Sequence, residues 1–252
     1  MRNILIIIVA LLVIAGCEDQ DYLHQKYLDE GEITYIGKSG FVQLRPGRYR
    51  LEAVWQLSND PKALYTVIEI EDDSITLFNS DYSTVDSFLV TDEDGNDVRQ
   101  EFAIGRYIIE NLDEKDYTLK FYQKDNEGNT SLKTENFTTV YGTKYEEALI
   151  NQSISSITYI DNDIVDEVDS VKVIFNNSKS AVGFIITYQS VVTGQNKTII
   201  LPKGSSEVVL AGTKRGGEFQ YSTRYLPTNG IDTVQSGFKS VVLPYPAIPD
   251  NS

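Results

Sequence analysis

Apolar and polar side chains alternate from Tyr49 to Leu57, and this two-residue period constrains the fold more than any other feature of the chain. Leu51, Ala53 and Trp55 fall on one side of the alternation, while polar residues dominate the other. A period of two is typical of a β-strand with one buried face. We therefore expect Trp55 to point into a core, where packing explains it better than ligand stacking.

Further short apolar runs, separated by Gly, Asn, Asp and Pro turns, continue along the rest of the chain. Spacings of about 8–12 residues between such runs favour a sandwich or barrel, and parallel α/β folds are poor candidates because long helices do not alternate with the strands. The predicted strands in addition to 49–57 are 35–44, 64–70, 74–78, 88–91, 105–110, 117–121, 137–141, 154–160, 171–175, 184–188, 198–201, 208–210, 219–225 and 238–243.

The 252 residues are enough for about two domains of ordinary size. Thr143 is followed three residues later by Glu146, which fits a capping box at the start of a helix. We therefore place a short helix between two domains. The predicted organisation is a signal peptide at 1–16, an acidic tether at 17–32, a first sandwich at 33–142, a bridging helix at 143–153, a second sandwich at 154–244 and a tail at 245–252.

Both halves carry a pattern that resembles immunoglobulin-like and fibronectin type III domains. In the first half, Leu112 is followed by Tyr117, Leu119 and Phe121, which resembles a tyrosine corner and the strand after it. A looser version in the second half consists of Leu210, Phe219, Tyr221 and Thr223. The predicted fold class is all-β, with two tandem immunoglobulin or fibronectin type III-like β-sandwiches.

The amino-terminal segment resembles a bacterial lipoprotein signal peptide. Arg2 precedes an apolar run from Ile4 to Ala15, which is shorter than the roughly 20 residues that a membrane-spanning helix needs. Gly16 and Cys17 follow, as in a lipobox, and imply acylation of Cys17. An ordinary secretory signal or an uncleaved anchor are the alternatives. Because the chain has 1 Cys, it has no intramolecular disulfide.

Charge and residue content exclude several classes of function. The net charge of −15 repels nucleic acid, so we expect no nucleic-acid partner. The single histidine, His24, lies in the predicted tether, so we expect no histidine triad, metal site or cofactor in the folded body, and no enzyme. Asp92, Asp94 and Asn96 suggest calcium only weakly, because Gly95 is out of place for an EF-hand, and a hairpin turn is favoured. Counting does not exclude a glycosidase, which needs only two carboxylates. We expect no such enzyme, because small tandem sandwiches offer no deep cleft and the acidic residues fall mostly in turns.

The order of segments resembles a family of Bacteroidetes surface lipoproteins classed as a domain of unknown function. This resemblance implies an outer-membrane location facing the cell exterior and a gene neighbourhood with SusC/SusD-like glycan-uptake pairs. The matching segments are Tyr27-Leu28, Gly31-Glu32, Tyr35-Ile36-Gly37-Lys38, Arg45-Pro46-Gly47-Arg48-Tyr49-Arg50, Trp55, Asp60-Pro61-Lys62, Asp125-Asn126-Glu127-Gly128-Asn129, Tyr141-Gly142-Thr143-Lys144-Tyr145-Glu146, Arg224-Tyr225-Leu226-Pro227 and Ile231-Asp232-Thr233. Separately, residues 73–75, 169–171 and 232–234 each resemble the Bacteroidetes periplasmic O-glycosylation motif, Asp-Ser/Thr followed by an aliphatic residue.

Two functional hypotheses follow. The first is a noncatalytic lipoprotein, held at the membrane through Cys17, that assists glycan capture or uptake as an accessory binding module, alone or with a SusC/SusD-like complex. Stacking on sugar would need exposed aromatic rings, for which Tyr122, Tyr188 and Tyr225 are candidates. The alternative is a structural or adhesive spacer at the cell surface that binds a protein partner.

Overall fold

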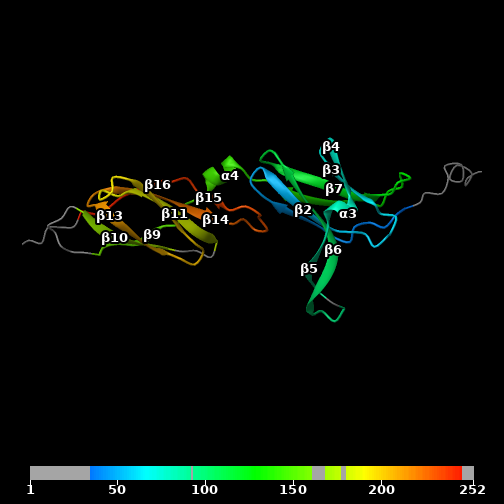
Figure 1. The fold of residues 1–252 in the computed structure, drawn as a ribbon, viewed down its shortest axis with the longest axis horizontal. Coiled ribbons are helices and arrows are strands. Elements are labelled where there is room, and N and C mark those ends of the chain that lie inside the picture. Colours follow the sequence, from blue (N-terminus) through cyan, green and yellow to red (C-terminus); the bar gives the residue numbers. More distant parts are fainter. Residues whose placement is uncertain (1–34, 92, 161–167, 177–179, 246–252) are drawn as a thin grey trace, which may run out of the picture.

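The computed structural model describes residues 35–91, 93–160, 168–176 and 180–245. Strands dominate, and they form two β-sandwiches that follow one another along the chain (Figure 1). The predicted fold class is therefore confirmed. The predicted signal peptide and Cys17 lie outside the described residues, as do the tether and nearly all of the tail.

The first sandwich consists of two four-stranded sheets with antiparallel neighbours. One has the order β1-β2-β6-β5 and the other β4-β3-β7-β8. The strands are β1 (Val42–Pro46), β2 (Arg50–Gln56), β3 (Tyr65–Ile70), β4 (Asp73–Phe78), β5 (Ser83–Thr91), β6 (Asp97–Glu110), β7 (Asp116–Lys124) and β8 (Thr134–Thr139).

The second sandwich pairs a three-stranded sheet, β13-β10-β9, with a larger sheet of order β12-β11-β14-β15, in which β16 also pairs with β14. Its strands are β9 (Ile154–Tyr159), β10 (Val168–Phe175), β11 (Ala181–Gln189), β12 (Asn196–Leu201), β13 (Glu207–Lys214), β14 (Glu218–Tyr225), β15 (Val234–Gln235) and β16 (Lys239–Val242).

Each sandwich has its own apolar core, built from the inward side of the two-residue period. In the first, Trp55 is fully buried, and the centroids of its ring and the ring of Phe121 lie 6.0 Å apart. In the second, the rings of Phe175 and Phe184 stack at 4.3 Å. Burying such large apolar side chains on the facing sides of two sheets is the main stabilising contribution in a sandwich.

The tyrosine corner predicted at Tyr117 is present. Its hydroxyl accepts a hydrogen bond of 2.9 Å from the backbone N–H of Asp113, four residues upstream, while the ring is buried. This contact fixes the turn that leads into β7. In the second sandwich Phe219 is the corresponding second residue of β14, and it has no hydroxyl to make this bond.

Several element bounds differ from the sequence-based prediction. The first strand begins at Val42 rather than Tyr35. β5 and β6 are longer than the predicted 88–91 and 105–110 and form a hairpin that projects away from the first sandwich (Figure 1). Because both faces of this projecting hairpin are partly exposed, its sequence lacks the regular alternation from which strands are predicted.

The helices are short. The unpredicted α3 (Asn79–Tyr82) precedes β5, and α4 (Thr143–Ala148) ends well before the predicted residue 153. The predicted capping box is wrong, because the carboxylate of Glu114 accepts the N–H bonds of Lys144 and Tyr145 instead. Neither described helix is long and apolar enough to cross a membrane.

The two sandwiches meet at the β1–β2 turn. The N–H of Ile231 donates to the carbonyl oxygen of Pro46 at 2.9 Å, and Arg50 bonds to the carboxylate of Asp232. The approach is close enough that a Cβ on Gly47 would lie 2.5 Å from the Asp232 carboxylate, and one on Gly230 would lie 2.4 Å from the Tyr141 hydroxyl. Glycine at these positions is what allows the contact.

Candidate functional site

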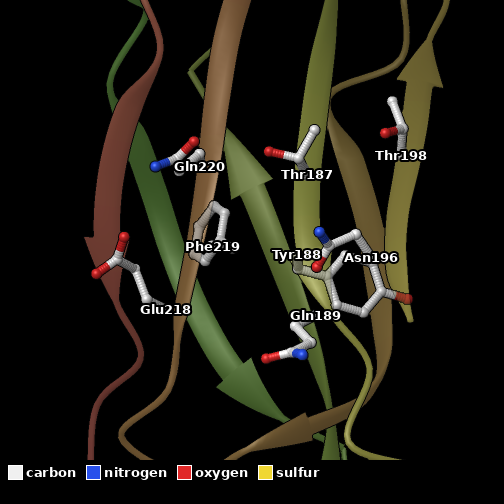
Figure 2. A pocket seen from close by; sticks show the side chains of 8 residues that line it. All are labelled: Thr187, Tyr188, Gln189, Asn196, Thr198, Glu218, Phe219 and Gln220. Atoms are coloured by element: carbon white, nitrogen blue, oxygen red, sulfur yellow. The ribbon is translucent and has the colours of Figure 1, made fainter. Parts of the chain in front are cut away.

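A shallow hollow of about 380 Å³ lies on the outer side of the larger sheet of the second sandwich (Figure 2). Its lining comes from the neighbouring strands β12, β11 and β14. We call its outward-pointing side chains the polar face. They are Thr187, Gln189, Asn196, Thr198, Glu218 and Gln220.

The strand register brings these side chains together. Thr187 on β11 pairs with Thr198 on β12 and with Gln220 on β14, and Gln220 pairs with Ser240 on β16. The four residues therefore form one row across the sheet. Gln189 pairs with Asn196 in the next row.

The polar face arises because the two-residue period of β11 and β14 divides the side chains between core and solvent. Ile186 and Phe219 point inward and are buried, while Thr187, Gln189 and Gln220 alternate with them on the outer side. The same pattern was available in the sequence, as a strand whose outward positions are amides and hydroxyls rather than charges. We did not predict a site from it.

The chemistry of the polar face is nearly neutral. Glu218 is the one carboxylate among the residues that line the hollow. The amides of Gln189, Asn196 and Gln220 each offer a donor and an acceptor, and the threonine hydroxyls offer both. The Gln220 amide also donates to the hydroxyl of Ser240 at 3.2 Å, which holds it against the sheet. Such a surface suits a neutral ligand rich in hydroxyl groups.

The matching sheet of the first sandwich is different. Its outer side carries ion pairs between Lys133 and Glu69 at 2.7 Å and between Lys120 and Glu135 at 3.4 Å. The Lys133 ammonium also lies over the ring of Tyr122, 5.0 Å from its centroid. Charges that already pair with one another leave less polar capacity for a neutral ligand. The outer side of this sheet therefore does not repeat the polar face of the second sandwich.

The predicted stacking residues are not free rings on a wet surface. Tyr188 is wrong as a stacking candidate, because it is only 5% exposed and belongs to the second core. The hydroxyl of Tyr225 donates to the carbonyl of Ile150 and accepts from the amide of Gln152, which ties the ring to the start of the second sandwich. Tyr122 is half-buried beneath Lys133.

Two carboxylates from the segments that carry the family resemblance, Asp60 and Asp125, accept hydrogen bonds from the backbone. Asp125 accepts the N–H bonds of Glu127 and Asn129, and the Asn129 side chain holds the pKa of Asp125 below its ordinary value. Asp60 accepts from the N–H groups of Lys62 and Gly37, and these bonds lower its pKa as well. Both residues shape turns. Among the described residues, no group of three or more His, Cys, Asp or Glu is arranged to hold a metal ion.

The remaining predicted positions are dispersed. Asp94 and Asn96 lie in the turn between β5 and β6, where Gly95 has a φ of +84°, as a tight turn requires, and residue 92 lies outside the described part. His24 also lies outside it. Of the three predicted glycosylation segments, 73–75 is in edge strand β4, 169–171 is in β10, and 232–234 is at the junction of the sandwiches.

A family model for DUF4998, described as a domain of unknown function, matches residues 17–234. The chain belongs to this family. The match begins at Cys17, covers the first sandwich and extends through the second as far as Val234, so that β16 lies beyond it. A search of curated proteins finds no match.

Solved structures with a similar arrangement include tandem fibronectin type III segments from chicken. A two-domain segment of chicken tenascin is 13% identical, with 82% of this chain and 99% of that chain covered and a TM-score of 0.28. The FN1–FN3 domains of chicken CNTN1 are 11% identical, with 83% and 69% covered and a TM-score of 0.32. The chicken interferon gamma receptor alpha chain is 8% identical, with 83% and 99% covered and a TM-score of 0.31.

Proposed function

We propose that this chain is a noncatalytic, lipid-anchored surface protein that binds glycan on the polar face of its second sandwich. The observation that carries the proposal is the row of hydroxyl and amide side chains across β12, β11 and β14, whose donors and acceptors match the hydroxyl groups of a sugar. A single carboxylate in the hollow, Glu218, supports binding rather than hydrolysis, because glycoside hydrolysis ordinarily uses two.

The proposal includes the anchor and the setting. Acylation of Cys17 would hold the protein at the outer membrane, facing the cell exterior, beside a SusC/SusD-like uptake pair. The start of the family match at Cys17 supports this position as the beginning of the mature domain. Metabolic labelling with a fatty acid tests the anchor, since the Cys17→Ala variant should lose the label.

Glycan-array binding by the full chain tests the polar face. The affinity for each sugar that binds on the array is then measured in solution. The Thr198→Ala and Gln220→Ala variants should each lose about fivefold in affinity, because one hydrogen bond is worth about 1 kcal/mol. Thr76→Ala is the matched control. Thr76 is an exposed threonine on β4, an edge strand of the first sandwich that pairs with β3 as β12 pairs with β11. Equal loss in all three variants, or none, would contradict the proposal.

The alternative function is a cell-surface spacer that binds a protein partner. The junction of the sandwiches favours it, because ionic and backbone hydrogen bonds through Arg50 and Ile231 join the two units directly. A joint of this kind suits a projecting rod. Cross-linking on intact cells followed by purification separates the two functions. Recovery of a SusC/SusD-like complex supports glycan uptake, and recovery of a host or neighbouring-cell protein supports the spacer.

A further inference from the structure

The hairpin of β5 and β6 ends one sheet of the first sandwich with an uncovered strand. β5 is the last strand in the order β1-β2-β6-β5, and its nine residues make it the longest edge strand in the described part of the chain. An edge strand presents backbone N–H and C=O groups that another strand can pair with, and proteins usually block such edges with lysine, proline, a bulge or shortness.

β5 has none of these protections. Its sequence, STVDSFLVT, contains no lysine or proline, and its register with β6 runs without a shift from Ser83–Gly105 to Thr91–Asp97. Its one charge, Asp86, is already paired with Arg106 at 3.0 Å. Among the other edge strands, β9 carries no charge, but it has six residues and its register with β10 shifts between Ile174 and Phe175. β12 carries Lys197 and β13 carries Glu207 and Lys214.

The hairpin is preformed rather than loose. On one side the rings of Phe88 and Phe102 pack against Phe41, with centroid distances of 4.9 Å for Phe41–Phe88 and 5.7 Å for Phe41–Phe102. On the other side Val85 and Leu89 are 67% and 64% exposed. The aromatic cluster already orders this edge strand, so that pairing with another strand costs little conformational entropy. The exposed side chains of Val85 and Leu89 would gain apolar contacts on pairing.

We propose that β5 pairs with β5 of a second copy of this chain, antiparallel about a two-fold axis at Ser87. The sequence of β5 is self-complementary in that register. Val85 of each copy lies opposite Leu89 of the other, Thr84 opposite Val90, and Ser83 opposite Thr91. Isologous pairing of this kind closes after two copies.

The charges agree with this pairing. Asp86 faces Phe88 of the second copy rather than its own counterpart. Glu101, which pairs with Ser87 on β6, lies three strand spacings from its counterpart, or about 14 Å, beyond the screening length of about 8 Å in physiological salt. One bond must be released, since the carboxylate of Asp86 accepts the N–H of Ser87 at 2.8 Å. The joined sheet has eight strands.

Disulfide trapping tests the proposed two-fold axis at Ser87. It is carried out with the full chain on intact cells that express it. Paired Ser87 residues would have Cα atoms about 5.5 Å apart, within the range for a disulfide. The Ser87→Cys variant should form a covalent dimer under mild oxidation. Thr76→Cys, on exposed edge strand β4, is the matched control, and the wild-type chain reports any contribution from Cys17. Absence of the Ser87 dimer, or an equal dimer from Thr76→Cys, would overturn the proposal.

A second measurement uses the mass of the full chain in detergent by sedimentation. Wild type should be a dimer that strengthens with added salt, because the net charge of −15 opposes association. Leu89→Lys should be a monomer with an unchanged melting temperature, since Leu89 is exposed. Ile200→Lys, 61% exposed on edge strand β12, should remain a dimer. A monomeric wild type, including one that captures an unrelated extended peptide on β5, contradicts a self-pairing edge.

Discussion

Arg50 and Asp232, 182 residues apart in sequence, form a two-pronged ion pair that joins the sandwiches. Nε lies 2.9 Å from Oδ2 and Nη2 lies 2.6 Å from Oδ1. The backbone N–H of Arg48 donates to the same Oδ2 at 2.9 Å. Bidentate pairs of this geometry are the stronger kind, because two parallel bonds also fix orientation. Asp232 therefore helps to fix the orientation of the second sandwich relative to the first.

The first prediction concerns this joint. Asp232→Ala should loosen the two sandwiches, so that the distance distribution from small-angle scattering broadens. The loss in coupling should be about 1 kcal/mol, because both side chains keep some solvent exposure. Glu207→Ala is the control, since Glu207 forms a surface ion pair of 2.8 Å with Lys172, and both residues belong to the second sandwich. An unchanged distribution for Asp232→Ala would show that backbone contacts such as Ile231 to Pro46 suffice.

The second prediction is the pH dependence of the joint. The hydrogen bond from Arg50 holds the pKa of the Asp232 carboxyl below its ordinary value, while burial opposes this effect. A lowered pKa in the folded state contributes stability above the ordinary value of about 3.9, and that contribution disappears as the pH falls through the lowered value. Tyr141 also faces Asp232, but burial raises its pKa, so it stays neutral throughout.

Scattering profiles should therefore be constant from pH 7 to about pH 5 and broaden only below about pH 4. Asp232→Asn is the matched variant, since it keeps the shape of the side chain and cannot titrate. Its profile should be broad at neutral pH and should not change further through this joint. Broadening of the wild type between pH 7 and 5 would point to a different group.

The strands could be predicted because burial on one face imposes a two-residue period that is visible without a structure, as at Leu51, Ala53 and Trp55. The Arg50–Asp232 joint could not, because each residue alone looks like a charged turn position, and only the fold brings them together. The polar face shows the intermediate case. Its residues alternate visibly, but the row from Thr198 to Ser240 depends on a register that no local pattern specifies.

The third prediction concerns buried polar groups in the first core. The fully buried Gln123 accepts from the amide of Asn79 at 3.0 Å and donates to the hydroxyl of Ser39 at 2.8 Å. Thr66 joins this group and accepts from the indole N–H of Trp55 at 2.9 Å. Removing one member leaves the others buried without their bonds, which costs more than an exposed bond is worth.

Gln123→Ala should lower the free energy of unfolding by about 3 kcal/mol, from lost hydrogen bonds and the cavity left behind. Urea unfolding followed by tryptophan fluorescence measures it, since Trp55 is the single tryptophan and lies in this core. Gln100→Ala, at an exposed position on β6, should change the value by less than about 0.5 kcal/mol. Similar values for both variants would mean that the buried network relaxes without cost.

The fourth prediction is the contribution of the tyrosine corner. Tyr117→Phe removes the hydroxyl that accepts from the N–H of Asp113, while the buried ring stays in place. The free energy of unfolding of the first sandwich should fall by about 1 kcal/mol, the usual net value of one such bond. Tyr122→Phe on the same strand keeps its ring beneath Lys133 and should change little. If Tyr122→Phe lowered the free energy of unfolding more than Tyr117→Phe, the hydroxyl of Tyr122 on the sheet surface, and not the tyrosine corner, would be the stabilising group.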